Sequence, residues 1–150
     1  MSGGLTPEQL DELLREAIVA RLGTITPDGY PHIVPVWTAW DGGAIWLVAR
    51  AKADYVVNLS ANPRVSLSIV RPDAAETRAL ILGRAEIIEG PAPLSGRMDS
   101  IAREMALRYE GEAGERYIEE SQGWPRVLVR IVPERITSWG DPGWHPRYHG

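Results

Sequence analysis

The chain has 150 residues with a formal net charge of −4, and 44% of its residues are hydrophobic. That size and balance are typical of one soluble domain with a sizeable core, here residues 1–150. The negative charge argues against nucleic acid as a partner. No apolar run is as long as about eighteen residues, which predicts no membrane span. The chain has no cysteine, which excludes disulfides and thiolate chemistry. Its polar N-terminus carries no signal-peptide pattern, so we expect a cytoplasmic protein.

The first predicted element is a helix. Thr6 can cap it, Pro7 fits its first position, and Gln9 completes a capping box. Apolar residues then recur at helical spacing, so the helix is expected to run to about Ala20.

Most of the remaining elements are predicted strands. Turn sequences at 27–29 and 41–43 separate three short apolar strands, which indicates an antiparallel meander. The middle strand contains Pro31 and Pro35, so it must lie at an edge, carry a bulge or open toward a ligand. Asp54 is a candidate cap for a short helix, and Pro133 is expected to kink or bulge the last strand. The predicted strands are 22–26, 30–40, 44–49, 64–70, 77–89 and 126–139, and the later helices are 54–60, 95–109 and 115–120.

Six strands with peripheral helices and no βαβ rhythm predict a mainly β protein built on a small antiparallel barrel. Catalytic motifs are scarce in it. His145 and His149 are four residues apart, but Pro146 lies between them and the segment is not helical in pattern, so we expect no metal site. His32 is expected to be exposed. With no nucleophile elbow or phosphate loop we name no catalytic residue, and an enzyme built on this chain would take its chemistry from a cofactor.

One cationic stretch is a candidate anion site. Arg50 and Lys52 follow a predicted strand, and the helix after them would present free backbone N–H groups and the positive end of its dipole. A phosphate placed there would gain charge-assisted hydrogen bonds. The alternative is that the two cations only solvate a strand end. Arg126, after Trp124-Pro125, is expected to be a surface charge at a strand start.

Other strand residues have structural interpretations. The tryptophans on paired strands fill either a core or a dimer interface; they are Trp37, Trp40 and Trp46. Cross-strand ion pairs are a further possibility, joining Arg78 and Arg84 to Glu86 or Glu89.

Three motifs, taken together, resemble a known family. They are the hairpin 22–29 with Pro31 and 35–37, the segment from Asn58-Leu59 through 62–67, and the closing strand 133–139. Their order and spacing resemble the pyridoxamine 5′-phosphate oxidase-like superfamily of FMN-binding split barrels, over about residues 15 to 140. The resemblance implies a six-stranded antiparallel split β-barrel. It also implies a homodimer with FMN, or a deazaflavin, held between two barrels.

The resemblance further implies positions that bind the cofactor. The second strand would line the flavin ring, and the third would lie beside the phosphate and ribityl chain. Arg78 falls where the family has a polar flavin ligand, and Trp139 matches a tryptophan that packs at the cofactor from the other subunit. The implied positions are Val34, Pro35, Val36, Trp37, Thr38, Val48, Ala49, Arg78 and Trp139.

The phosphate site departs from the family pattern. The basic pair that family members commonly carry before the short helix aligns with Asp54-Tyr55 here. Arg50 or Lys52 would therefore have to replace it, with Tyr55 donating its hydroxyl. These three residues complete the predicted cofactor site.

The first hypothesis is an FMN-dependent oxidoreductase that acts on a small molecule as a homodimer. An alternative on the same fold uses the deazaflavin coenzyme F-420, whose polyglutamate tail would need a basic groove made by Arg50, Lys52 and Arg78. A third hypothesis, from another class, is a non-catalytic protein that binds a flavin or haem.

Overall fold

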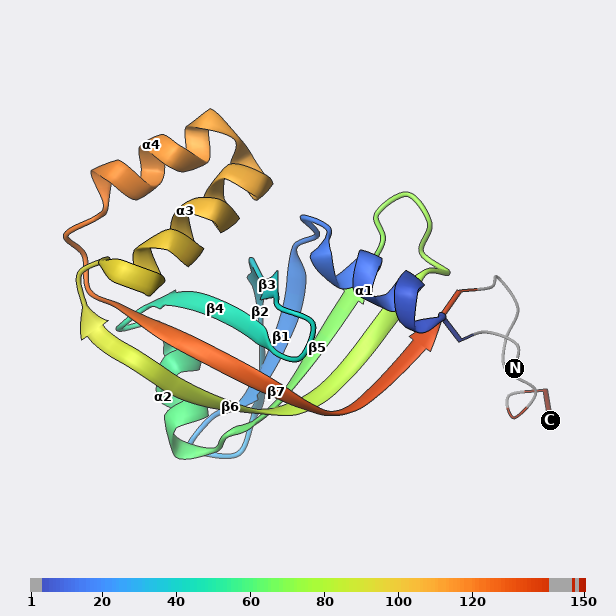
Figure 1. The fold of residues 1–150 in the computed structure, drawn as a ribbon. Coiled ribbons are helices and arrows are strands. Elements are labelled where there is room, and N and C mark those ends of the chain that lie inside the picture. Colours follow the sequence, from blue (N-terminus) through green and yellow to red (C-terminus); the bar gives the residue numbers. More distant parts are fainter. Residues whose placement is uncertain (1–3, 141–146, 148) are drawn as a thin grey trace.

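The structure, a computed structural model, describes residues 4–140, 147 and 149–150. In this part of the chain one antiparallel sheet of seven strands is surrounded by four helices (Figure 1). The strands are β1 (Ala20–Ile25), β2 (Pro31–Val36), β3 (Ala39–Trp40), β4 (Ile45–Arg50), β5 (Arg64–Val70), β6 (Arg78–Ala92) and β7 (Arg126–Trp139). The helices are α1 (Pro7–Arg15), α2 (Asp54–Ala61), α3 (Gly96–Glu110) and α4 (Glu112–Glu120). Among these helices, none has the length and apolar character that a membrane crossing requires.

The sheet is a curled, antiparallel ribbon with the order β2-β1-β5-β6-β7-β4-β3. Its two edge strands, β2 and β3, follow each other in the chain with only Trp37 and Thr38 between them. The sheet therefore bends until its edges come close, although no backbone ladder among the described strands joins them. The mainly β antiparallel fold is confirmed, but the number of six strands was wrong. The segment 30–40 is two strands because its first half pairs with β1 and its second with β4.

The expected irregularity in the last strand is confirmed as a β-bulge. Leu82 pairs with Arg135 whereas Gly83 pairs with Pro133, which leaves Glu134 as the extra residue. A Cβ at Gly83 would lie 2.6 Å from the carbonyl oxygen of Val132, so the close approach of β6 and β7 requires glycine here.

The capping box of α1 is confirmed, but the predicted end of the helix was wrong. The Thr6 hydroxyl accepts from the Gln9 backbone N–H at 3.1 Å, and the Gln9 side chain accepts from the Thr6 N–H at 2.9 Å. The helix ends at Arg15, because Glu16 has an extended backbone and forms an ion pair with Arg71. The apolar pattern continues to Ile18 because Ile18 and Ala20 are buried where the chain passes into β1.

The helix α2 is fixed to the sheet by the asparagines of the second motif. Asp54 is its first residue rather than its cap, and the capping position is Ala53, without a side-chain hydrogen bond. Buried Asn58 donates to the Thr24 hydroxyl at 3.1 Å. Asn62 accepts from the backbone N–H of Arg64 at 3.1 Å and turns the chain into β5. These contacts explain the motif and fix where the N-terminus of α2 lies.

Two hydrophobic cores share strand β4, whose side chains alternate between them. Ile45, Leu47 and Ala49 point into the main core inside the curled sheet, together with residues of α1, α2 and the other long strands. Trp46 and Val48 pack on the other side, against a second core made with the hairpin of α3 and α4. Figure 1 shows this hairpin beside β4, at the end of the sheet where β6 ends and β7 begins.

The tryptophans on the early strands all pack against a core. Trp40 lies against the main core, and Trp37 and Trp46 against the second one. The expectation that His32 is exposed was wrong: it is half-buried on β2, and its Nδ1 is buried without a hydrogen-bond partner among the described residues. His32 lies on the same side of edge strand β2 as Val34 and Val36, which pack in the main core, and this position covers part of the ring.

Candidate functional site

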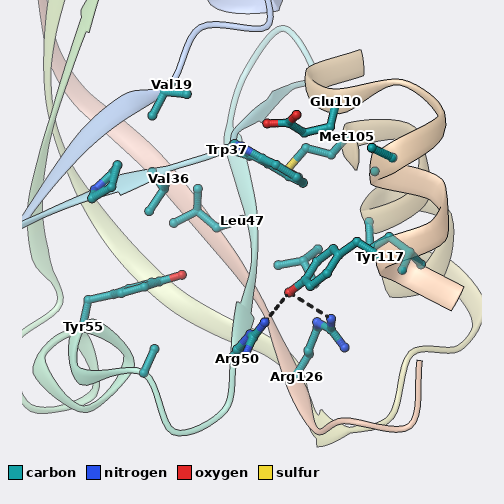
Figure 2. A pocket seen from close by; sticks show the side chains of 17 residues that line it. Val19, Val36, Trp37, Leu47, Arg50, Tyr55, Met105, Glu110, Tyr117 and Arg126 are labelled. Carbon is teal, nitrogen blue, oxygen red and sulfur yellow. Dashed lines mark hydrogen bonds between the residues drawn. The ribbon is translucent and has the colours of Figure 1, made fainter. Parts of the chain in front are cut away.

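A cavity of about 650 Å³ lies between the curled sheet and the α3–α4 hairpin. Its walls come from β2, β4, the start of α2, the two hairpin helices and the first residue of β7. It is lined by Val19, Pro35, Val36, Trp37, Leu47, Val48, Arg50, Ala53, Tyr55, Ala102, Met105, Glu110, Ala113, Gly114, Tyr117, Ile118 and Arg126. Figure 2 shows the aromatic and charged members of this lining. The size is in the range of small-molecule and cofactor sites, about 300 to 1,000 Å³.

One end of the cavity is cationic. Arg50 and Arg126 are directly opposite each other on the antiparallel pair β4 and β7. Both donate to the hydroxyl of Tyr117 from α4, Arg50 through Nη2 at 2.8 Å and Arg126 through Nη2 at 3.4 Å (Figure 2). We call these three residues the arginine–tyrosine cluster. Like charges that face each other across two strands repel, so the cluster favours a bound anion or other acceptor.

The two arginines of the cluster differ in their surroundings. Arg126 is 2% exposed, and it donates to the carbonyl oxygens of Ser121 and Trp124 at 2.7 and 3.2 Å and to the Ser121 hydroxyl at 2.6 Å. The expectation of a surface charge was therefore wrong, because the turn 121–125 folds back over this guanidinium. Arg50 is exposed and stacks on Trp124, with 4.7 Å from Cζ to the ring centroid. Its guanidinium has one hydrogen-bond partner among the described residues, Tyr117.

Two tyrosines with opposite pKa shifts project into the cavity. Burial by itself raises the pKa of Tyr117, but the hydrogen bonds and charges of Arg50 and Arg126 outweigh it, so the pKa is lower than usual. Burial, with a smaller contribution from Tyr117, raises the pKa of Tyr55 to about 12. The raised pKa keeps Tyr55 protonated at neutral pH, and a protonated phenol at either position can donate to an acceptor in the cavity.

The other end of the cavity is apolar and aromatic, with one carboxylate. Trp37 lies there beside Met105, and its ring stacks on Tyr109 with centroids 5.3 Å apart. Tyr109 in turn donates to the carbonyl oxygen of Ile18 at 2.7 Å, which holds α3 against the start of β1. Glu110 also lines this end, away from the arginine–tyrosine cluster in Figure 2. Its carboxylate has no hydrogen-bond or ion-pair partner within the described part of the chain.

The structure places six of the twelve predicted cofactor-binding residues in the lining of this cavity. They are Pro35, Val36, Trp37, Val48, Arg50 and Tyr55. The other six lie elsewhere: Val34, Thr38, Ala49, Lys52, Arg78 and Trp139.

The residues outside the lining have different surroundings. Ala49 is 1% exposed in the main core, and Thr38 is buried, with its backbone N–H donating to the Tyr109 hydroxyl at 3.2 Å. Lys52 is exposed beyond the end of β4. Arg78 and Trp139 are cross-strand neighbours at the far end of the sheet, with the guanidinium carbon 4.8 Å from the indole centroid.

The arginines predicted as ion-pair partners of Glu86 and Glu89 were wrong. Glu86 pairs with Arg130, its direct neighbour on β7, and Glu89 pairs with Arg97 at the start of α3. Arg78 instead donates to the carbonyl oxygen of Ala75 at 3.2 Å. The reason is that the two arginines and the two glutamates all lie on β6, so none of them can be the cross-strand partner of another.

Sequence reasoning missed the contribution of the C-terminal half. Tyr117 lies in an acidic helix that has the composition of a solvated face, and Arg126 follows a Trp-Pro turn. Neither has a local pattern that indicates a site. The signal that could have found them is the register of β4 on β7, which places Arg126 opposite Arg50.

The lining suits a planar aromatic ligand that carries an acidic group. Apolar and aromatic side chains cover most of the walls, while the arginine–tyrosine cluster and the free first turn of α2 supply donors at one end. Among the described residues there is no group of three or more acidic or histidine side chains that could hold a metal ion. His145, half of the histidine pair considered above, lies outside the described residues.

These features define a mainly antiparallel β fold with four helices, consistent with a split barrel, and a cavity of cofactor size beside its sheet. Residues 6–140 match the pyridoxamine 5′-phosphate oxidase family, and the chain belongs to it. The resemblance drawn from the three motifs is thereby confirmed. No curated protein matches the sequence.

Several solved structures have this fold. A conserved hypothetical protein of Mycobacterium tuberculosis, Rv2991, is similar with a TM-score of 0.72 and 28% identity, over 96% of this chain and 93% of that one. An F420 reductase is similar with a TM-score of 0.68 and 24% identity, over 85% of this chain and 94% of that one. HutZ, the haem storage protein of Vibrio cholerae, is similar with a TM-score of 0.69 and 22% identity, over 93% and 96% of the two chains.

Proposed function

We propose that this protein is an FMN-dependent oxidoreductase that acts on a small molecule. The observation that carries the proposal is the cavity itself, which joins an aromatic, apolar compartment to a cationic end in a chain of the pyridoxamine 5′-phosphate oxidase family. A bound flavin would supply hydride or electron transfer, for which the described side chains offer no substitute of their own.

The residues of the chain have distinct tasks in this proposal. Arg50, exposed at the end of β4, would contact the phosphate, and Tyr55 would donate its hydroxyl from the first turn of α2. Trp37, Val36 and Met105 would cover the ring and exclude water from it. Lys52, which follows Arg50 but does not line the cavity, would contribute only at the mouth.

We further propose that the working unit is a homodimer. The outer face of β6 exposes Leu80 and Leu82, each 38% accessible, and neighbouring Val70 and Val132 are 37% and 44% accessible. A second copy of the chain would cover these side chains. The pair Arg78 and Trp139 lies at one end of the same strands, where it would reach the ring end of the partner's cofactor.

Binding of FMN to the purified protein tests the proposal. We expect a yellow complex with quenched flavin fluorescence at micromolar FMN, and a dimer by light scattering. Riboflavin, which lacks the phosphate, should bind more weakly. A protein that leaves both flavins free at these concentrations would contradict the assignment.

Coenzyme F-420 is the second candidate cofactor. Its support in this structure is that Lys52 is exposed next to Arg50, so a basic edge continues outward from the cationic end of the cavity, where an anionic tail could lie. Competition between FMN and coenzyme F-420 for the same protein would decide between them. A non-catalytic flavin- or haem-binding role would be recognised by ligand binding without turnover when NAD(P)H and an electron acceptor are supplied.

A further inference from the structure

The cationic end of the cavity is built from two distant parts of the chain. Arg50 comes from the end of β4, while Tyr117 and Arg126 come from α4 and the start of β7. The family's usual basic pair falls on Asp54-Tyr55, which holds no cation. The donors for an anion must therefore come from elsewhere, and the helical hairpin is the element that brings one to Arg50.

The hydrogen bonds leave the Tyr117 hydroxyl with one free donor. Its oxygen already accepts from Arg50 at 2.8 Å and from Arg126 at 3.4 Å. A phenol oxygen has two acceptor positions and one proton, so the proton of Tyr117 has no acceptor among the described residues and remains available to a ligand. Burial raises the pKa of this phenol, but the two guanidinium groups outweigh burial and make the phenol more acidic than usual, and thus a stronger donor.

Arg126 cannot easily turn toward a ligand. Its Nη1 is committed to the Ser121 and Trp124 carbonyl oxygens, and its Nη2 to the Ser121 and Tyr117 hydroxyls. It is therefore a positioning residue that fixes Tyr117 and supplies charge. The guanidinium of Arg50, with one hydrogen-bond partner in the described structure, has N–H groups left for a ligand.

We propose that Tyr117 is a direct ligand of the anion, and that it and Arg50 together bind a phosphate monoester at this end of the cavity. The inference rests on the proposed function, because it assigns the residues that would hold the phosphate of the cofactor. It goes beyond the proposed function because it places a phosphate-binding residue on the α3–α4 hairpin. This hairpin is then part of the binding site rather than peripheral to it. Tyr55 faces the same space from α2.

The test compares FMN with riboflavin in matched tyrosine variants. In Tyr117→Phe the lost charge-assisted hydrogen bond should weaken FMN binding about tenfold to a hundredfold and leave riboflavin binding unchanged. Tyr30→Phe is the control, because Tyr30 is 69% exposed and does not line the cavity. Equal FMN affinity in wild type and Tyr117→Phe would overturn the proposal, and so would equal losses of FMN and riboflavin.

A second measurement separates this proposal from the flavin assignment. Ionised Tyr117 would repel an anion, so bound inorganic phosphate should raise the pH at which Tyr117 becomes a tyrosinate, seen as the ultraviolet transition absent from Tyr117→Phe. The groups that face Tyr117 are Arg50, Arg126 and Tyr55, and sodium chloride at equal ionic strength controls for screening. A phosphate shift without FMN binding would retain the anion site and reject the flavin. FMN binding with no phosphate shift would retain the flavin assignment and reject the anion site at Tyr117.

Discussion

Two arginine–tryptophan pairs lie near opposite ends of β7 and have almost the same geometry. Arg50 lies 4.7 Å from the ring centroid of Trp124, and Arg78 lies 4.8 Å from that of Trp139. Their neighbours differ. The residue opposite Arg50 on β7 is Arg126, a like charge, whereas the residue opposite Arg78 is the tryptophan itself. Both pairs therefore share the cation–π contact, and the facing like charge and the adjoining cavity distinguish the Arg50 end.

The largest effect is expected where the charge is buried. Arg126→Met should lower the free energy of unfolding by about 4 kcal/mol, because two or more buried acceptors lose their donor at about 1–3 kcal/mol each. Arg50→Met, at the exposed partner, should cost under about 1 kcal/mol. Urea unfolding of the two variants measures the contrast. Similar losses in both would show that burial does not separate these arginines.

The raised pKa of Tyr55 should give the next effect, a loss of stability at alkaline pH. The folded protein holds the Tyr55 proton more tightly than the unfolded chain, so this contribution to stability is present below pH 10 and is lost as the pH rises toward 12. The loss should be about 3 kcal/mol, at about 1.36 kcal/mol for each pKa unit. Unfolding curves of wild type and Tyr55→Phe across this range test it, and parallel pH profiles would contradict the raised pKa.

Ligand binding should separate the two arginine–tryptophan pairs directly. Arg50→Met should weaken FMN about tenfold to a hundredfold while riboflavin is little changed, since the guanidinium would contact the phosphate alone. Arg78→Met should affect FMN and riboflavin alike, because in the proposed dimer it reaches the ring end. Fluorescence titrations provide both values. A phosphate-selective loss in Arg78→Met would reverse the roles given to these two residues.

The smallest effect concerns the far pair within one subunit. Arg78→Met removes the contact with Trp139 and should lower the free energy of unfolding by about 1 kcal/mol or less. Thermal unfolding of the variant and the wild type at one protein concentration measures it.

Thermal unfolding at several protein concentrations tests the proposed dimer. If the exposed apolar strands form the dimer interface, the melting temperature of wild type should rise with concentration, and a concentration-independent value would argue against a reversible dimer.

Local patterns determined most of the elements of this fold. The capping box at Thr6, the strand 64–70 and the bulge near Pro133 were predictable because each depends on neighbours in the chain. Errors occurred where a long-range contact overrode the pattern. The segment 30–40 became two strands because its halves pair with different partners, and α1 stopped at Arg15 although the apolar residues continue into the core.

For the site, the sequence by itself determined that a cation ends β4 and that a helix begins close behind it. The resemblance to the family also implied Val36 and Trp37, and both line the cavity. Only the tertiary structure decided which donors meet there. Arg126 and Tyr117 are more than sixty residues from Arg50, and it is the β4–β7 register and the packing of α4 that bring them together. Such contacts depend on three-dimensional pairing, which carries no signature in the neighbouring residues.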